Sequence, residues 1–140
     1  MKKLISYRIA TQFSLFLFGL LALFHLSVIF GIVIFNYAPI DFLWGGRMAT
    51  TGQLLGFEVV SLVVILLCLF IVLVRSKRIR IPTLIGVSKA GLWLLFILFL
   101  INTIGNLLAK TTFEKLFAIL TALLAILCLR MALESTSKMD

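Results

Sequence analysis

The chain has 140 residues, of which 63% are hydrophobic and 13% are charged, and its mean hydropathy is +1.25. A soluble domain of this size leaves a large share of its surface in water, so this composition excludes a soluble fold and makes lipid the solvent. The net charge is +8, but the basic residues lie between apolar segments and form no nucleic-acid-binding motif, so we expect no nucleic-acid partner.

Four apolar segments are long enough, or nearly so, to cross a bilayer, which takes about 20 residues. They cover residues 13–36, 54–74, 87–108 and 114–133. Pro39 and Pro82 fall between the segments, so no proline interrupts a span. We predict an all-α fold, a four-helix antiparallel transmembrane bundle in which residues 1–140 form one membrane domain. Cys68 and Cys128 lie inside spans and are expected to be small apolar filler.

The basic residues are distributed unevenly between the two ends of such a bundle. One end would carry ten of them: Lys2, Lys3, Arg8, Arg75, Lys77, Arg78, Arg80, Lys89, Arg130 and Lys138. The other end would carry three: Arg47, Lys110 and Lys115. The positive-inside rule then predicts a multi-pass protein of the cell (inner) membrane with both termini in the cytoplasm, and the imbalance argues against dual topology.

Cytoplasmic basic residues also predict lipid contacts. We expect the loop residues Arg75, Lys77, Arg78 and Arg80 to bind anionic headgroups of the bilayer. Lys89 and Arg130 lie near the cytoplasmic ends of their spans, where long side chains snorkel toward water.

Four polar side chains inside the spans need an explanation, because ionisable and amide groups are costly in lipid. They are His25, Glu58, Asn102 and Asn106. His25 lies about three turns below the outer end of its span, Glu58 about one turn below the outer end of the next, and the two asparagines near the outer end of the third. Each lies on a stripe that can face inward. The sequence therefore predicts a ligand-binding site in the outer half.

The outer loop contains the run Trp44-Gly45-Gly46-Arg47. Two glycines permit a tight turn with positive φ, which could fold Arg47 over the bundle toward Glu58. The alternative is a surface turn with an interfacial tryptophan, and both remain open. We include Arg47 among the candidate ligand-binding residues.

The fourth span carries small residues on one side, at Ala118, Ala122, Ala125 and Ala132. Such a stripe lets membrane helices approach closely. It indicates a helix that packs within the bundle, while a homo-oligomer or membrane-partner interface through Ala118, Ala122 and Ala125 is the competing interpretation.

Each polar residue also has an ordinary structural interpretation. His25 can form an interhelical hydrogen bond, Glu58 can pair with Arg47 near water, and an asparagine pair one turn apart commonly joins helices. No G-x-S-x-G or H-E-x-x-H motif occurs. The chain has one histidine, so no second histidine is present to share a metal ion with it. We therefore expect no metal, no cofactor and no assignable catalytic residue.

The stretch from Leu100 to Lys110, followed by Phe113-Glu114-Lys115, resembles a family of small uncharacterised four-helix bacterial membrane proteins. The resemblance extends to the Trp44–Arg47 turn and to Phe57-Glu58, and it implies a four-helix membrane fold without an activity. The leading hypothesis is binding or transport of a small ligand in the outer half. The alternatives are a non-catalytic accessory subunit and, third, a lipid-modifying enzyme.

Overall fold

The computed structural model describes residues 5–135, and this part of the chain is helical without any strand. Its four α-helices are α1 (Tyr7–Phe35), α2 (Thr51–Arg75), α3 (Leu84–Leu107) and α4 (Thr112–Ala132), and a short 3-10 turn, η1 (Trp44–Gly46), lies in the first connection. All four α-helices are long and apolar enough to cross a membrane. The predicted four-helix bundle is confirmed, and the protein is a multi-pass membrane protein.

The helices extend beyond the apolar segments because polar caps, which hydropathy does not detect, determine where they begin. Ser6, Thr50 and Thr111 each accept a hydrogen bond from the amide three residues later, at the starts of α1, α2 and α4. As a result α1 begins at Tyr7, six residues before the predicted span. α3 begins at Leu84, three residues before its predicted span, without a side-chain cap.

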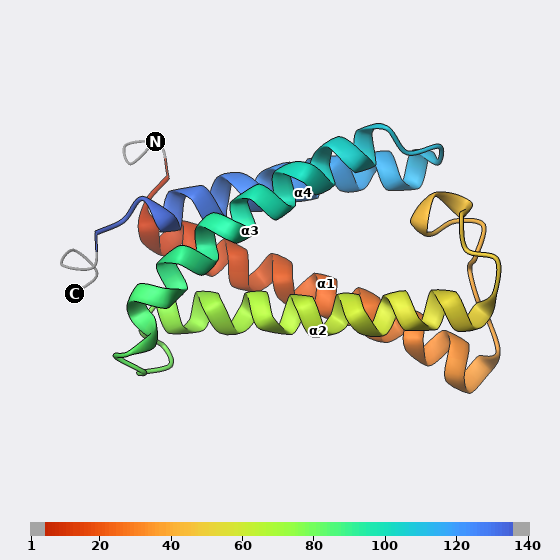
Figure 1. Ribbon diagram of the computed structural model, residues 1–140, viewed down its shortest axis with the longest axis horizontal. Helices are drawn as coiled ribbons and strands as arrows, with labels where there is room; N and C mark the ends of the chain where they lie inside the picture. The colour runs from red at the N-terminus through yellow and green to blue at the C-terminus, as the bar shows by residue number, and fades with distance from the viewer. Residues whose placement is uncertain (1–4, 136–140) are drawn as a thin grey trace.

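The helices form two antiparallel hairpins, α1 with α2 and α3 with α4 (Figure 1). The connection 36–50 and the turn 108–111 lie at one end of the bundle, called the loop end below. The connection 76–83, the start of α1 and the end of α4 lie at the opposite end, called the Arg75 end. α3 begins near the end of α2 and approaches α4 toward the loop end, so α2 and α3 diverge in that direction (Figure 1).

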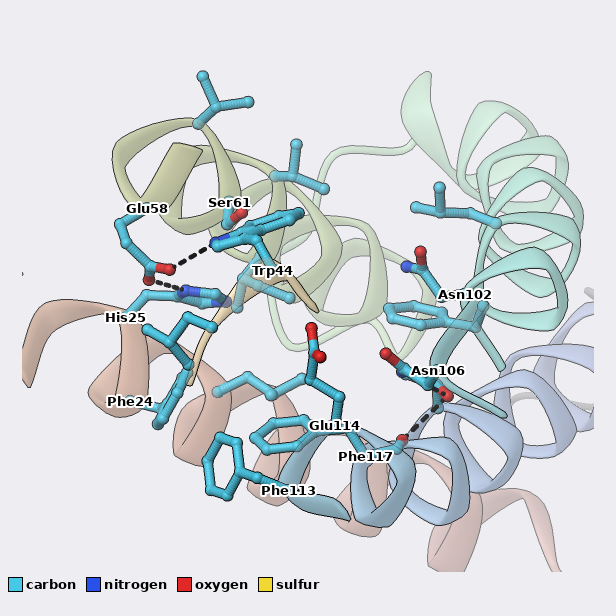
Figure 2. A pocket seen from close by; sticks show the side chains of 18 residues that line it. Phe24, His25, Trp44, Glu58, Ser61, Asn102, Asn106, Phe113, Glu114 and Phe117 are labelled. Atoms are coloured by element: carbon cyan, nitrogen blue, oxygen red, sulfur yellow. Dashed lines mark hydrogen bonds and ion pairs between the residues drawn. The ribbon is translucent and has the colours of Figure 1, made fainter. Parts of the chain in front are cut away.

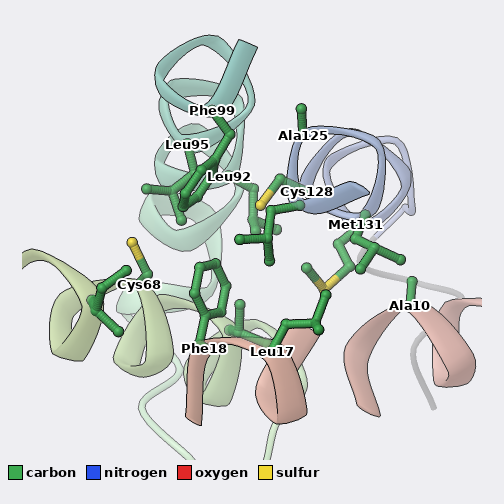
Figure 3. Packing of buried hydrophobic residues seen from close by; sticks show 14 of the residues in the cluster. Ala10, Leu17, Phe18, Cys68, Leu92, Leu95, Phe99, Ala125, Cys128 and Met131 are labelled. Atoms are coloured by element: carbon green, nitrogen blue, oxygen red, sulfur yellow. The ribbon is translucent and has the colours of Figure 1, made fainter. Parts of the chain in front are cut away.

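The main apolar core fills the half of the bundle nearer the Arg75 end. Phe18 of α1 packs there against Phe99 of α3, with ring centroids 5.6 Å apart, and Cys68 and Cys128 are fully buried beside them (Figure 3). The core thins toward the loop end, where a smaller cluster around Ile32, Leu43 and Leu54 attaches the 36–50 connection to α1 and α2. The two hairpins are therefore held together at one end and separated at the other.

The small-residue side of α4 packs inside the bundle. Ala118 and Ala125 are 4% exposed and Ala132 is fully buried, while Ala122 is half-buried. The chain's own α1 and α3 pack against α4. This burial agrees with a helix that packs within the bundle. An interface with another chain through Ala118, Ala122 and Ala125 stays a prediction.

Two arginines expected to face headgroups are instead buried at the Arg75 end. The Arg75 side chain is fully buried and donates to the backbone carbonyl of Glu134. Arg130 is 3% exposed, forms an ion pair with Glu134 at 2.7 Å and donates to the carbonyl of Ile5. In this arrangement both guanidinium groups bond to the chain's own carbonyl and carboxylate groups away from the surface, although Nε of Arg75 has no hydrogen-bond partner among the described residues. Headgroup binding stays a prediction for Lys77, Arg78 and Arg80.

Candidate functional site

A cavity of about 260 Å³ lies at the loop end, where the two hairpins separate (Figure 2). All four helices and the η1 turn contribute to its lining. His25, Glu58, Asn102 and Asn106 all line it, so the structure brings these four predicted site residues around one space. The depth argument placed them correctly, because residues at equal depth on neighbouring inward-facing stripes converge.

The contact between His25 and Glu58 joins α1 to α2. Nδ1 of His25 lies 2.6 Å from Oε2 of Glu58, and the two side chains are 13% and 1% exposed. A proton lies between these atoms, since two lone pairs this close repel when neither atom carries one. The ring of Phe24 packs edge-on against the imidazole, with centroids 5.4 Å apart. Glu58 is thus a buried acid whose side-chain partner, His25, is supplied by the neighbouring helix.

The second Glu58 oxygen binds the outer connection. Nε1 of Trp44 donates to Oε1 of Glu58 at 2.9 Å (Figure 2). The Trp44 ring also packs on Phe57, with centroids 5.0 Å apart. Both carboxylate oxygens are therefore satisfied, as the burial of an acid requires. The indole lies over the cavity and links the connection to α2.

Positive backbone angles aim Trp44 into the cavity. Trp44, Gly45 and Gly46 have φ of 54°, 71° and 62°, and a Cβ added at Gly46 would lie 3.3 Å from the carbonyl oxygen of Asp41. The sequence prediction of a positive-φ turn is confirmed. Of the residues in this turn, Trp44 and not Arg47 bonds to Glu58. Arg47 is exposed and is absent from the cavity lining.

Glu114 is the site residue that the sequence analysis missed. It stands in the first turn of α4, accepts hydrogen bonds from the Gly45 amide and from the Thr111 hydroxyl, and its carboxylate lies in the cavity (Figure 2). The Thr111-x-x-Glu114 spacing is typical of a helix start, a signal that the sequence analysis did not use. It did not signal that α4 begins opposite the η1 turn, which is a tertiary relationship.

The two asparagines differ in their contacts. Nδ2 of Asn106 lies 3.5 Å from Oγ1 of Thr121 on α4, a long and therefore weak hydrogen bond. The Asn102 amide faces the cavity and has no hydrogen-bond partner among residues 5–135 (Figure 2). Asn102 is exposed, so its amide is free to bond to water or to a ligand in the cavity.

Aromatic rings form much of the remaining wall. Phe24, Phe113 and Phe117 contact one another, with centroids 5.1–6.4 Å apart, and Phe99 and Trp44 complete the aromatic lining. The lining holds two carboxylates and one imidazole but neither lysine nor arginine. In the described part of the chain, no three His, Cys, Asp or Glu side chains gather as metal ligands would. The cavity is consequently acidic and aromatic.

Comparison with known proteins adds no family to this description: no protein-family model, no curated protein and no solved structure matches the chain. The class that fold and site define is a four-helix membrane protein with an acidic, aromatic cavity at the loop end.

Proposed function

We propose that the protein binds a small organic cation in the cavity at the loop end, as a binding or transport protein of the bacterial inner membrane. The observation that carries this proposal is the lining: Glu58 and Glu114 face one aromatic space that contains neither lysine nor arginine and a single histidine. Carboxylates attract a cation, and aromatic faces stabilise ammonium groups by about 0.5–2 kcal/mol each. The paired His25 can carry one positive charge, which leaves the second carboxylate uncompensated within the lining.

Both acids are bonded in a way that a ligand can replace. Each accepts one hydrogen bond from the outer connection, Glu58 from Trp44 and Glu114 from Gly45. Each also keeps a second partner on its own side, His25 or Thr111. A cation that enters the cavity can displace the connection from both acids without leaving either one unpaired. Asn102, which lacks a partner in residues 5–135, supplies a further polar contact.

The experiment is a calorimetric titration of the purified protein with choline and with 3,3-dimethylbutanol, its uncharged carbon isostere. We expect choline to bind and the isostere to bind about tenfold or more weakly, a difference of ~1.4 kcal/mol. Glu58→Gln and Glu114→Gln should each weaken choline binding to a similar degree. Asp41→Asn, which removes an exposed acid outside the cavity lining, is the matched control and should change nothing. Equal binding of the two compounds would overturn the proposal.

Charge distribution supports an orientation with the loop end outside the cell. Among residues 5–135, the Arg75 end carries Arg8, Arg75, Lys77, Arg78, Arg80, Lys89 and Arg130, and the loop end carries Arg47, Lys110 and Lys115. We propose cytoplasmic termini on this basis. The cavity would then open toward the periplasmic side, and labelling of cysteines placed at the two ends tests this.

A second candidate function is acid–base chemistry on a membrane-dissolved substrate. The observation that favours it is the 2.6 Å contact between His25 and Glu58, since a carboxylate that orients an imidazole is a recurring arrangement in general-base catalysis. An enzyme of this kind would lose turnover on His25→Gln while retaining choline binding at Glu114. A protein without turnover in which His25→Gln abolishes choline binding would instead be the binding protein.

A further inference from the structure

A second hollow lies on the same side of the bundle, nearer the Arg75 end. It measures about 280 Å³ and lies between α2 and α3, lined by Leu67, Ile71 and Val74 on α2 and by Val87, Gly91 and Leu94 on α3. Ser88 contributes its only polar side chain, and that hydroxyl is bonded to the carbonyl of Ile85. The second hollow is therefore an apolar groove.

The lining residues of the groove and of the cavity follow one another along common stripes of α2 and α3, which together are called the seam below. On α2, the residues lining the two spaces include a stripe with steps of three or four: Val60, Val64, Leu67, Ile71 and Val74. On α3, the corresponding stripe is Leu84, Val87, Gly91, Leu94, Leu98 and Asn102. From Val60 to Val74 the seam is about 20 Å long at 1.5 Å per residue.

Much of the seam is exposed, although Val74 at its Arg75 end is buried. Val60, Leu67, Val87 and Leu94 are 62%, 56%, 63% and 67% exposed, so no other part of the described chain covers them. Gly91 leaves the floor of the groove without a side chain, and a Cβ there would lie 3.2 Å from the Ile71 side chain. The polarity changes along the seam: acids and an amide line its loop end, and hydrocarbon lines the rest.

We propose that the ligand is a membrane amphiphile, with a cationic headgroup in the cavity and one hydrocarbon chain in the α2–α3 groove. This inference rests on the proposed function and names its ligand class. Charge complementarity selects the headgroup, because two carboxylates, Glu58 and Glu114, face it against one imidazole and neither lysine nor arginine. The groove selects the chain, because it continues from the cavity into the hydrocarbon region, which is about 30 Å thick. The amphiphile enters sideways from the bilayer.

The test uses the protein in dodecylmaltoside micelles with Trp93 replaced. The chain has two tryptophans, and Trp93 lines neither space, so Trp93→Phe leaves Trp44 as the single reporter inside the cavity. The probes are dodecyltrimethylammonium, dodecyl sulfate and choline, with the amphiphiles expressed as mole fraction in the micelle. We expect the emission of Trp44 to respond to dodecyltrimethylammonium and to choline, and to respond at least about tenfold more weakly to dodecyl sulfate.

Val87→Phe fills the groove with a larger ring and should weaken dodecyltrimethylammonium binding about tenfold without affecting choline. Ile97→Phe is the matched control, because Ile97 is an exposed α3 residue outside both spaces, and it should affect neither probe. Equal responses of the Val87 and Ile97 variants would overturn the groove while leaving the cation site intact. Absence of choline binding in the unsubstituted protein would overturn the proposed function itself.

A photolabelling experiment on the unsubstituted chain tests the groove without relying on the folding of a variant. A dodecyltrimethylammonium analogue with a diazirine near the chain end should label peptides that contain Leu67–Val74 and Val87–Leu94 in the unsubstituted chain. Labelling concentrated instead on the exposed face of α4, around Leu116 and Ile119, would overturn the groove assignment.

Discussion

The contact between His25 and Glu58 allows a quantitative test of the site's construction. His25→Leu removes the partner of Oε2 and leaves a carboxylate that is 1% exposed with one hydrogen bond, from Trp44. Hydrogen bonds to charged groups contribute about 1.5–3 kcal/mol in proteins. Interhelical bonds in membranes average only ~0.6 and reach ~1.7 kcal/mol. The short distance of 2.6 Å and the burial of Glu58 place this pair near the upper membrane value.

We therefore expect His25→Leu to lower the free energy of unfolding by about 2 kcal/mol. We also expect a coupling free energy of about 1.5 kcal/mol between His25→Leu and Glu58→Leu. The double variant should be more stable than the sum of the single effects predicts, because it leaves no unpaired buried acid. The measurement is reversible unfolding by SDS in mixed micelles, followed by far-UV circular dichroism.

Ser27→Ala on the same helix is the control. Ser27 is exposed and its hydroxyl bonds the carbonyl of Leu23 within α1, so its removal should shift stability by less than about 0.5 kcal/mol. A coupling free energy between the His25 and Glu58 substitutions below ~0.5 kcal/mol, the scatter of independent sites, would refute the reasoning.

Two further predictions concern the turn and the orientation. Gly45→Ala forces a side chain into φ of 71° and should destabilise the protein by about 1–2 kcal/mol, whereas Gly52→Ala, inside α2 with open space around it, should stabilise it by about 0.5–1 kcal/mol in the same unfolding assay. In intact cells an impermeant maleimide should label Lys110→Cys at once and Arg78→Cys only after the inner membrane is permeabilised; the reverse pattern would contradict cytoplasmic termini. The two native cysteines are fully buried and should stay unlabelled.

Several features followed from the sequence because they depend on short segments. Hydropathy over about 20 residues identifies each span, since lipid requires every backbone group to be satisfied within its own helix. The costs of placing His25 and Glu58 in lipid marked them as residues that must face inward, and their distances from the span ends fixed their depths. The Gly-Gly pair predicted positive φ because only glycine adopts it freely. None of these inferences needs a contact between distant residues.

Only the tertiary structure decided which side chains meet. Trp44 rather than Arg47 reaches Glu58, because the packing of the 36–50 connection on α1 and α2 sets the direction of the turn. Glu114 joins the site because α4 starts beside that turn. Arg75 and Arg130 are buried around Glu134, although each had the position of a residue that reaches headgroups. Charge and hydropathy fix how deep a residue lies in the membrane. Which side chain it contacts depends on how far two helices diverge, and that divergence arises from packing between residues many turns apart.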